Sequence, residues 1–169
     1  MLAEDIAPNR LEKSKRIAGE LINQLVSDRV GIIAYASSAI PHLPITTDYA
    51  AARMFLASLD TNMISSQGTS MSSATNIAMN YFDDVDQSNK VVCLLSDGED
   101  HAEDALSAAK NAAKNGIIFI SIVVGTEKGA VIPIKKGNQI TYKKNLDGEV
   151  VVTKSNFKKM NQIAEQTNG

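Results

Sequence analysis

Apolar residues along the chain recur at two different spacings, which predict helices and strands in turn. Helices are predicted where apolar positions lie three or four residues apart, over residues 8–26, 48–59, 69–82, 102–115 and from 155 onward. Strands are predicted where short apolar runs occur, over residues 30–36, 39–45, 91–95 and 117–124. Because the two kinds of segment alternate from residue 30 to 124, we expect an α/β domain with a largely parallel sheet.

Two segments depart from this alternation. Pro41 and Pro44 lack the backbone N–H that a central strand needs, so the strand over 39–45 is expected to be antiparallel and at the sheet edge. After residue 124 the chain predicts short strands over 131–134, 140–142 and 150–152, and Asp147-Gly148 is a strong turn signal between the last two. We therefore expect a small β-hairpin region before the final helix.

The candidate chemistry gathers where the apolar run 91–95 stops at Ser96, Asp97 and Gly98. Ligands of parallel sheets bind at the carboxyl ends of strands, which is where Asp97 is expected. A hydroxyl-rich loop with Thr69 and Ser70 opens the helix upstream. A carboxylate and hydroxyls at one edge make an oxygen site of the kind that Mg²⁺ favours. The alternative, in which Asp97 and Thr69 or Ser70 only cap helices, stays open.

Other acidic clusters have simpler interpretations. Residues 99–101 (Glu-Asp-His) are consecutive and cannot all point at one ion, so we interpret the acids as favourable charges ahead of a helix. Residues 83–86 lack the glycine and the closing glutamate of a calcium loop and are predicted to form a solvated turn. One cysteine and two histidines are too few for a zinc site.

Composition narrows the class of protein further. The 169 residues fit a single domain over 1–169, and a formal net charge of −2 argues against nucleic acid as a partner. The chain has no phosphate-binding Gly-x-x-x-x-Gly-Lys loop and no Gly-x-Ser-x-Gly elbow. Cys93, the only cysteine, lies inside an apolar run and is predicted to be an inert buried thiol. No segment has the length of a membrane span, so the chain as given is expected to be soluble.

Taken in order, four stretches make the chain resemble a von Willebrand factor A (VWA) domain, namely residues 28–35, 68–69, 94–99 and 116–126. Residues 1–12 and 125–134 are similar to the VWA domain of bacterial aerotolerance-type (Bat) membrane proteins. The resemblance implies a Rossmann-like α/β fold, in which helices flank a mostly parallel central sheet. It also implies that the first and last strands are missing here and that the β-hairpin region is an insertion.

The family further implies a metal-ion-dependent adhesion site, or MIDAS, built from an Asp-x-Ser-x-Ser motif, a threonine and an aspartate. Thr69 matches the second motif and Asp97 the third, while Ser70, Ser96 and Gly98 are neighbours by proximity. The first motif is absent, so the metal site is expected to be incomplete. We expect Mg²⁺ or Mn²⁺ to bind in a full-length parent protein and weakly or not at all in this chain.

In the family's sheet the missing first strand is central, between the strand near Val30 and the one near Val91. Its absence is expected to leave two inward strand edges with unpaired backbone groups, which are costly when buried. We therefore expect either a distorted sheet or pairing with another molecule.

The function that the resemblance implies is that of a protein-interaction module, without catalysis, in an aerotolerance or stress-related protein. The expected partners are other Bat-type proteins and a MoxR-type AAA+ ATPase, and the expected location of the parent is the bacterial inner membrane. The alternative is a metal-dependent hydrolase or phosphotransferase that uses Asp97.

Overall fold

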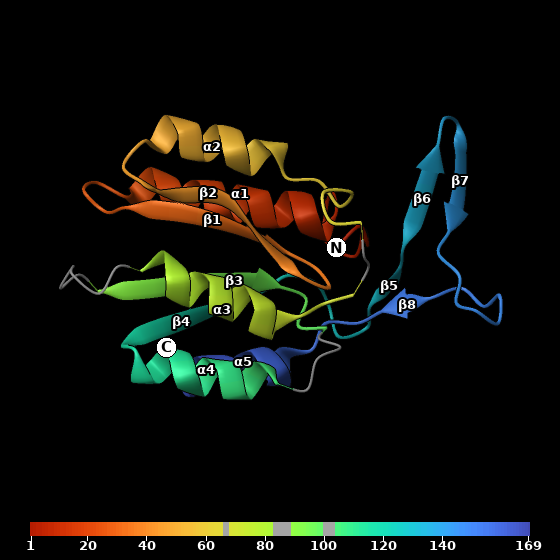
Figure 1. The fold of residues 1–169 in the computed structure, drawn as a ribbon. Coiled ribbons are helices and arrows are strands. Elements are labelled where there is room, and N and C mark those ends of the chain that lie inside the picture. The colour runs from red at the N-terminus through yellow and green to blue at the C-terminus, as the bar shows by residue number, and fades with distance from the viewer. Residues whose placement is uncertain (66–67, 83–88, 100–103) are drawn as a thin grey trace.

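The computed structural model describes residues 1–65, 68–82, 89–99 and 104–169 (Figure 1). The helices are α1 (Arg10–Gln24), α2 (Tyr49–Ser58), α3 (Met71–Tyr81), α4 (Ala105–Lys114) and α5 (Phe157–Glu165). The strands are β1 (Val30–Tyr35), β2 (Ala39–Thr46), β3 (Lys90–Ser96), β4 (Ile117–Val123), β5 (Ala130–Val131), β6 (Pro133–Lys136), β7 (Gln139–Tyr142) and β8 (Val152–Thr153). Every predicted helix is present, each within a few residues of its expected bounds.

Side-chain caps explain where four of these helices begin. The side chains of Asn9, Asp48, Ser70 and Asn156 each accept a hydrogen bond from a backbone amide in the first turn of α1, α2, α3 and α5. Ser70 is therefore the cap of α3, as one interpretation of the hydroxyl-rich loop predicted. Helix α4 follows Asp104 instead of Asp97, so the capping interpretation of Asp97 is wrong.

The main sheet is divided into two halves. Strands β1 and β2 pair antiparallel, with the proline-bearing β2 on the outside as predicted, and β3 pairs parallel with β4. Strands β1 and β3 run in the same direction, yet no ladder joins them among the strands that the structure describes (Figure 1). The two inward edges expected from the sequence are thus present, and β1 and β3 have not closed the space between them.

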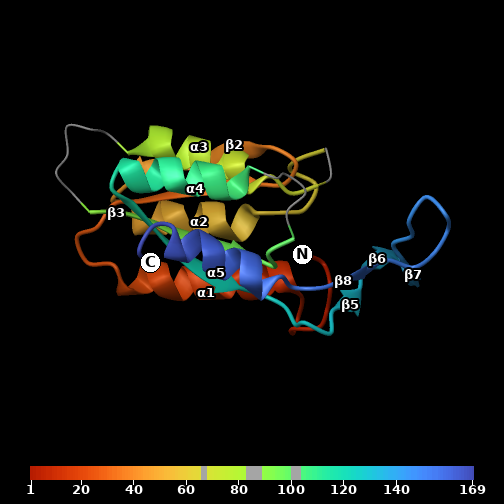
Figure 2. The same cartoon turned by 90° about the horizontal axis from the view of Figure 1, so that it is seen from below.

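Helix α3 bridges the two halves, because it contacts β1 and β2 on one side and α4 on the other. Seen from below, α1 and α5 lie on one side of the strands and α3 and α4 on the other (Figure 2). The apolar core is correspondingly double. One cluster forms around Ile22, Leu43, Ala52 and Leu56, and the other around α3, α4, α5, β3 and β4.

The divided sheet also leaves one face of β3 and β4 partly uncovered. Val91, Ile118 and Ile120 are 43%, 37% and 47% exposed, and Cys93 on the same face is exposed as well. The prediction of a buried Cys93 is therefore wrong, because the periodicity of an apolar run does not say whether both of its faces are covered. Desolvation by the surrounding residues still raises the pKa of the Cys93 thiol, which keeps it protonated at neutral pH.

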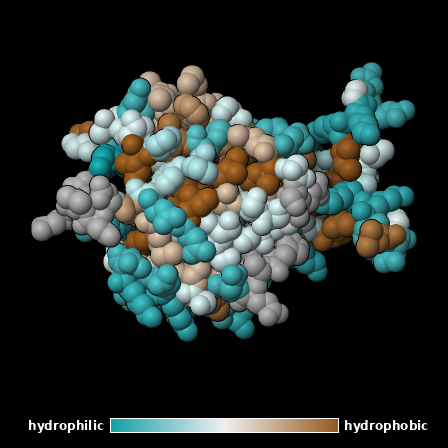
Figure 3. Space-filling model, viewed as in Figure 1, coloured by the Kyte–Doolittle hydropathy of each residue, from teal (hydrophilic) through white to brown (hydrophobic). Residues whose placement is uncertain are grey.

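The tail forms an arm that projects from the body (Figure 1). Strand β6 pairs with β7 around the turn at Gly137, and β5 pairs with β8 at the base of the arm. Around the Asp147-Gly148 turn, only a single bridge forms, between Lys144 and Val150. The hairpin predicted at this turn is therefore much shorter than expected, and the longer hairpin is the one between β6 and β7. Hydrophobic side chains stand among hydrophilic ones along this arm (Figure 3).

The unpaired edges of β1 and β3 predict self-association. We expect sedimentation velocity to show species larger than a monomer that increase with protein concentration, because exposed strand edges pair with other chains. Val91→Lys, which puts a charge on the uncovered face of β3, should reduce the effect. Val26→Lys is the matched control, since Val26 is 86% exposed and belongs to neither strand. A strict monomer at all concentrations would rule out intermolecular pairing.

Candidate functional site

Asp97 directly follows β3 and is almost completely buried, with 5% of its surface exposed. Its backbone carbonyl accepts a hydrogen bond from the amide of Asn156 at 2.7 Å, which fixes the start of α5 against the end of β3. Gly98 has φ +76°, and a Cβ there would collide with the Asn156 carbonyl. The glycine is therefore needed for this close approach, and Ser96 supports the turn by accepting the Gly98 amide at 3.0 Å.

The partner of the Asp97 carboxylate is Arg10, in the first turn of α1. Nη1 of Arg10 lies 3.0 Å from Oδ2 of Asp97, and the whole Arg10 residue is 0% exposed. Its guanidinium also donates two hydrogen bonds to Asp5, at 2.9 Å each, and two to the hydroxyl and the carbonyl of Thr153, at 3.0 Å each. All five N–H groups of the guanidinium are thus used, which is what allows a charge to be buried.

Asp5 extends this network to the loop after β4. Its Oδ2 accepts hydrogen bonds from the amide of Thr126 at 2.8 Å and from the Thr126 hydroxyl at 2.9 Å. The hydrogen bonds from Arg10, followed by those from Thr126, hold the pKa of the Asp5 carboxyl far below its usual range, although burial opposes this. Burial lowers the pKa of Arg10, but the carboxylates of Asp5 and Asp97 outweigh this effect and raise it. Both groups therefore stay charged at neutral pH.

Gly125 gives the guanidinium its space. A Cβ at this position would lie 2.7 Å from Nε of Arg10 and would overlap the hydroxyl of Ser155, and its φ of +140° is unfavourable for other residues. The Ser155 hydroxyl is buried and has no hydrogen-bond partner among the described residues. Gly125 and Ser155 are therefore part of the packing around Arg10.

Thr69 and Ser70 lie at the end of β1, because the amide of Ser70 donates a hydrogen bond to the Ala36 carbonyl at 2.7 Å. Asp97 follows the carboxyl end of β3, and the loop that carries Thr69 and Ser70 lies beside the carboxyl end of β1. Within the described part of the chain, however, the side-chain partners of Asp97 are Arg10, the amide of Glu99 and the amino group of Met1, and not Thr69.

These residues do not complete a magnesium site by themselves. One oxygen of Asp97 is already paired with a buried cation, and the described residues contain no group of three Asp, Glu, His or Cys side chains placed to hold an ion. A hard divalent cation needs several oxygen ligands at once. Asp100 and His101 of the acidic cluster, and the acidic turn over residues 83–86, lie outside the described residues.

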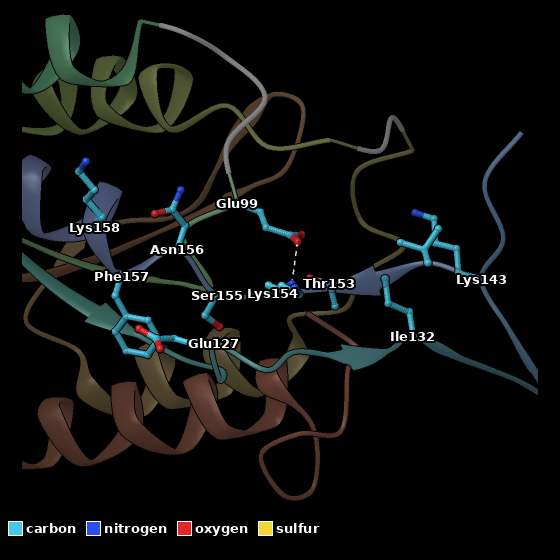
Figure 4. Close-up of a pocket in the computed structure, with 11 residues that line it drawn as sticks. Glu99, Glu127, Ile132, Lys143, Thr153, Lys154, Ser155, Asn156, Phe157 and Lys158 are labelled. Carbon is cyan, nitrogen blue, oxygen red and sulfur yellow. Dashed lines mark hydrogen bonds between the residues drawn. The ribbon is translucent and has the colours of Figure 1, made fainter. Parts of the chain in front are cut away.

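A cavity of about 750 Å³ lies beside the network, between the base of the arm and the start of α5 (Figure 4). Charges of both signs line it, from Glu99, Glu127, Lys143, Lys154 and Lys158. Glu99 spans one side, since its carboxylate accepts the Lys154 amide at 3.1 Å. The cavity thus shares Thr153 with the Arg10 network and favours neither anions nor cations by charge alone.

Sequence reasoning missed Arg10, Asp5, Thr126 and Thr153 as parts of the site. Arg10 and Asp5 occur in the N-terminal segment that resembles the Bat proteins, which was the only available signal. Nothing in their spacing shows that they meet a carboxylate 87 positions further along the chain.

The chain belongs to the von Willebrand factor type A domain family, whose model matches residues 3–166. Two solved structures resemble it over its whole length. BatB from Bacteroides thetaiotaomicron is 39% identical, with a TM-score of 0.95, and 82% of that chain is covered. An aerotolerance-related membrane protein from Bacteroides fragilis is 38% identical, also with a TM-score of 0.95, and 83% of it is covered. The Rossmann-like VWA fold is therefore established for this chain.

More distant structures share the fold alone. The TRAP protein of Plasmodium vivax, solved loaded with manganese, is 20% identical over 73% of this chain and 54% of its own, with a TM-score of 0.60. A comparison with curated proteins gave no match. None of the helices in the described ranges is long and apolar enough to cross a membrane.

The depressed pKa of Asp5 predicts how stability depends on pH. Because the folded state favours the carboxylate, the Asp5 contribution is complete above about pH 4 and is lost as the pH falls below it. Asp5→Asn should lower the free energy of unfolding at neutral pH by about 3 kcal/mol and flatten its decrease in acid. Denaturant unfolding at several pH values measures both. Asp147→Asn, at an exposed turn, is the control, and equal effects of the two substitutions would contradict the prediction.

Gly125→Ala is expected to destabilise the fold by about 2 kcal/mol or more, because the new methyl group meets Arg10 while the backbone is strained. Gly148→Ala is the matched control, since Gly148 also has positive φ, +84°, but has open space around it. The difference in thermal unfolding between the two variants isolates the collision. Equal losses would mean that the space around Arg10 is not the limiting factor.

Proposed function

We propose that this VWA domain is a protein-interaction module that presents the edge at Asp97 to a partner. The observation that carries the proposal is the Arg10 network, which fixes Asp97 at the carboxyl end of β3 and ties four separate segments to it. A surface that is rigid before binding loses less entropy when a partner docks. The likeness to BatB and to an aerotolerance-related membrane protein supports a role of this kind in the same class of proteins.

Within this proposal, Mg²⁺ or Mn²⁺ is expected to bind in a longer polypeptide that carries the Asp-x-Ser-x-Ser motif. Thr69 and Asp97 are the residues that would contribute to a Mg²⁺ or Mn²⁺ site, with the absent Asp-x-Ser-x-Ser motif supplying the other ligands. Among structures that share the fold, the Plasmodium vivax TRAP protein was solved loaded with manganese, and a mussel byssus protein was solved with a zinc-occupied MIDAS motif. In a longer polypeptide, residues ahead of Met1 would emerge beside Asp97, because the Met1 amino nitrogen lies 3.7 Å from its Oδ2.

The partners and the location remain those that the resemblance implies. We propose Bat-type proteins and a MoxR-type AAA+ ATPase as partners, and a parent protein at the bacterial inner membrane, in an aerotolerance or stress-related process. The relative from Bacteroides fragilis is described as a membrane protein, which supports this location.

The hydrolase or phosphotransferase alternative has less support. An aspartate that acts as a nucleophile or as the main metal ligand needs a free oxygen and further acids or bases near it. Asp97 is 5% exposed and ion-paired with Arg10, and the described residues place no cluster of acids or histidines beside it. A protein-binding role does not require such groups; it requires only a rigid surface around Asp97.

The first test is calorimetric titration with Mg²⁺ and Mn²⁺, on this chain and on an N-terminally extended form that carries the Asp-x-Ser-x-Ser motif. We expect binding in the extended form and little or none in this chain, since one ion-paired carboxylate cannot hold the ion. Binding to a MoxR-type ATPase is measured in parallel. Thr69→Ala should weaken binding to the ATPase, because Thr69 lies at the proposed edge. The substitution leaves the Arg10 network intact, because Thr69 does not bond to Arg10.

Asp104→Asn provides the control, since Asp104 is exposed and its side chain caps no amide. Metal binding in neither form would remove the metal from the proposal. Partner binding that is unchanged in Thr69→Ala and Asp97→Asn, or a hydrolytic turnover that Asp97→Asn abolishes, would overturn the interaction role of this edge.

A further inference from the structure

The arm formed by β6 and β7 is too small to be stable as an isolated ribbon, yet it projects from the body (Figure 1). Apolar side chains such as Ile140 and Tyr142 are exposed on it. Exposed apolar residues on one continuous face usually mark a binding surface.

The strand register shows which residues share the outer face of the arm. Paired residues in an antiparallel ladder point to the same side, so Ile140 lies beside Lys135, and Tyr142 lies beside Pro133. The bridge from Lys144 to Val150 continues this face toward the base. Its apolar members are strongly exposed, with values of 59% for Ile140, 47% for Tyr142, 44% for Val150 and 51% for Val152.

The opposite face of the arm is turned toward the body. Ile132, Lys143, Val151 and Thr153, which alternate with the outer residues along the chain, line the cavity at the start of α5 (Figure 4). The outer face is thus directed away from the cavity and from the Arg10 network, and neither feature explains its apolar residues.

The arm also concentrates positive charge. Residues 130–153 contain four lysines against two acidic residues, Asp147 and Glu149, which gives this segment a net charge of +2 in a chain whose net charge is −2. An ion pair joins Lys135 of this segment to Glu4 of the body at 2.7 Å, and because both side chains are largely exposed, the pair is weak and readily exchanged. On the outer face, Lys135 lies beside Ile140 and Lys144 lies beside Val150, whereas Lys136 pairs with Gln139 on the opposite face.

We propose that the outer face of the arm docks on the surface of an anionic lipid bilayer. Lysines near such a surface are attracted to its headgroups, while tyrosine and aliphatic side chains enter the interface between headgroups and acyl chains. The lysines on the stripe complement anionic headgroups, and a bilayer surface adapts to a narrow row of exposed side chains. The inference rests on the proposed function in one respect, because a parent at the membrane brings a bilayer within reach.

The test is co-sedimentation of the protein with vesicles of phosphatidylcholine alone and of phosphatidylcholine with phosphatidylglycerol. We expect binding to the anionic vesicles that weakens as salt is added. Lys135→Glu with Lys144→Glu, which reverses two charges on the outer face, should reduce the partition coefficient about tenfold or more, and Ile140→Ser with Tyr142→Ser should also reduce it. All four positions are exposed, and circular dichroism verifies that the variants are folded.

The matched control is Lys110→Glu with Lys114→Glu on α4, which changes the net charge equally on another surface. Binding that is lost in the arm variants and kept in the control supports the proposal. No binding by the unaltered protein, or equal loss in the control, overturns it. Arm variants that bind vesicles normally but lose a protein partner overturn it as well. The arm variants alter no residue at the Asp97 edge, so partner binding measured on the same variants distinguishes failure here from failure of the Asp97 edge.

Discussion

The structure depends above all on one buried cation, the guanidinium of Arg10. Its five hydrogen bonds join the N-terminal segment, the end of β3 and the base of the arm, and Asp5 carries the connection to the loop after β4. Burying such a charge is costly unless every donor is satisfied, so the segments around it have little freedom to move separately. The rigidity of the Asp97 edge is a consequence of this constraint.

The same arrangement explains why the body can tolerate a divided sheet. Between β1 and β3 the described structure has no backbone ladder, and two separate apolar clusters take the place of one core. Helix α3 packs across the division, while Arg10, at the start of α1, reaches the carboxyl end of β3. Helix packing and one ion-pair network thus hold the two halves of the sheet together, which is the role that hydrogen bonds between strands have in an undivided sheet.

The carboxyl edge and the arm differ in character. The edge at Asp97 is buried, charged and fixed by many hydrogen bonds, which suits recognition of a partner with a defined shape. The outer face of the arm is exposed and apolar, with lysines around it, which suits a surface without defined shape. Both extend from the same end of the strands, so a domain docked by its arm would hold the Asp97 edge near the same surface (Figure 1).

The sequence by itself determined the helices, the strands of the body, the edge position of β2 and the family resemblance, because periodicity and proline chemistry are local properties. It offered Thr69 and Ser70 as alternative caps of α3 without deciding between them. It also placed Asp97 at a strand end. Only the tertiary structure decided that Asp97 pairs with Arg10, that Cys93 is exposed and that the apolar stripe of the arm faces outward. Contacts between residues far apart in the chain leave no periodic signal, and the exposure of a strand face depends on which neighbours cover it.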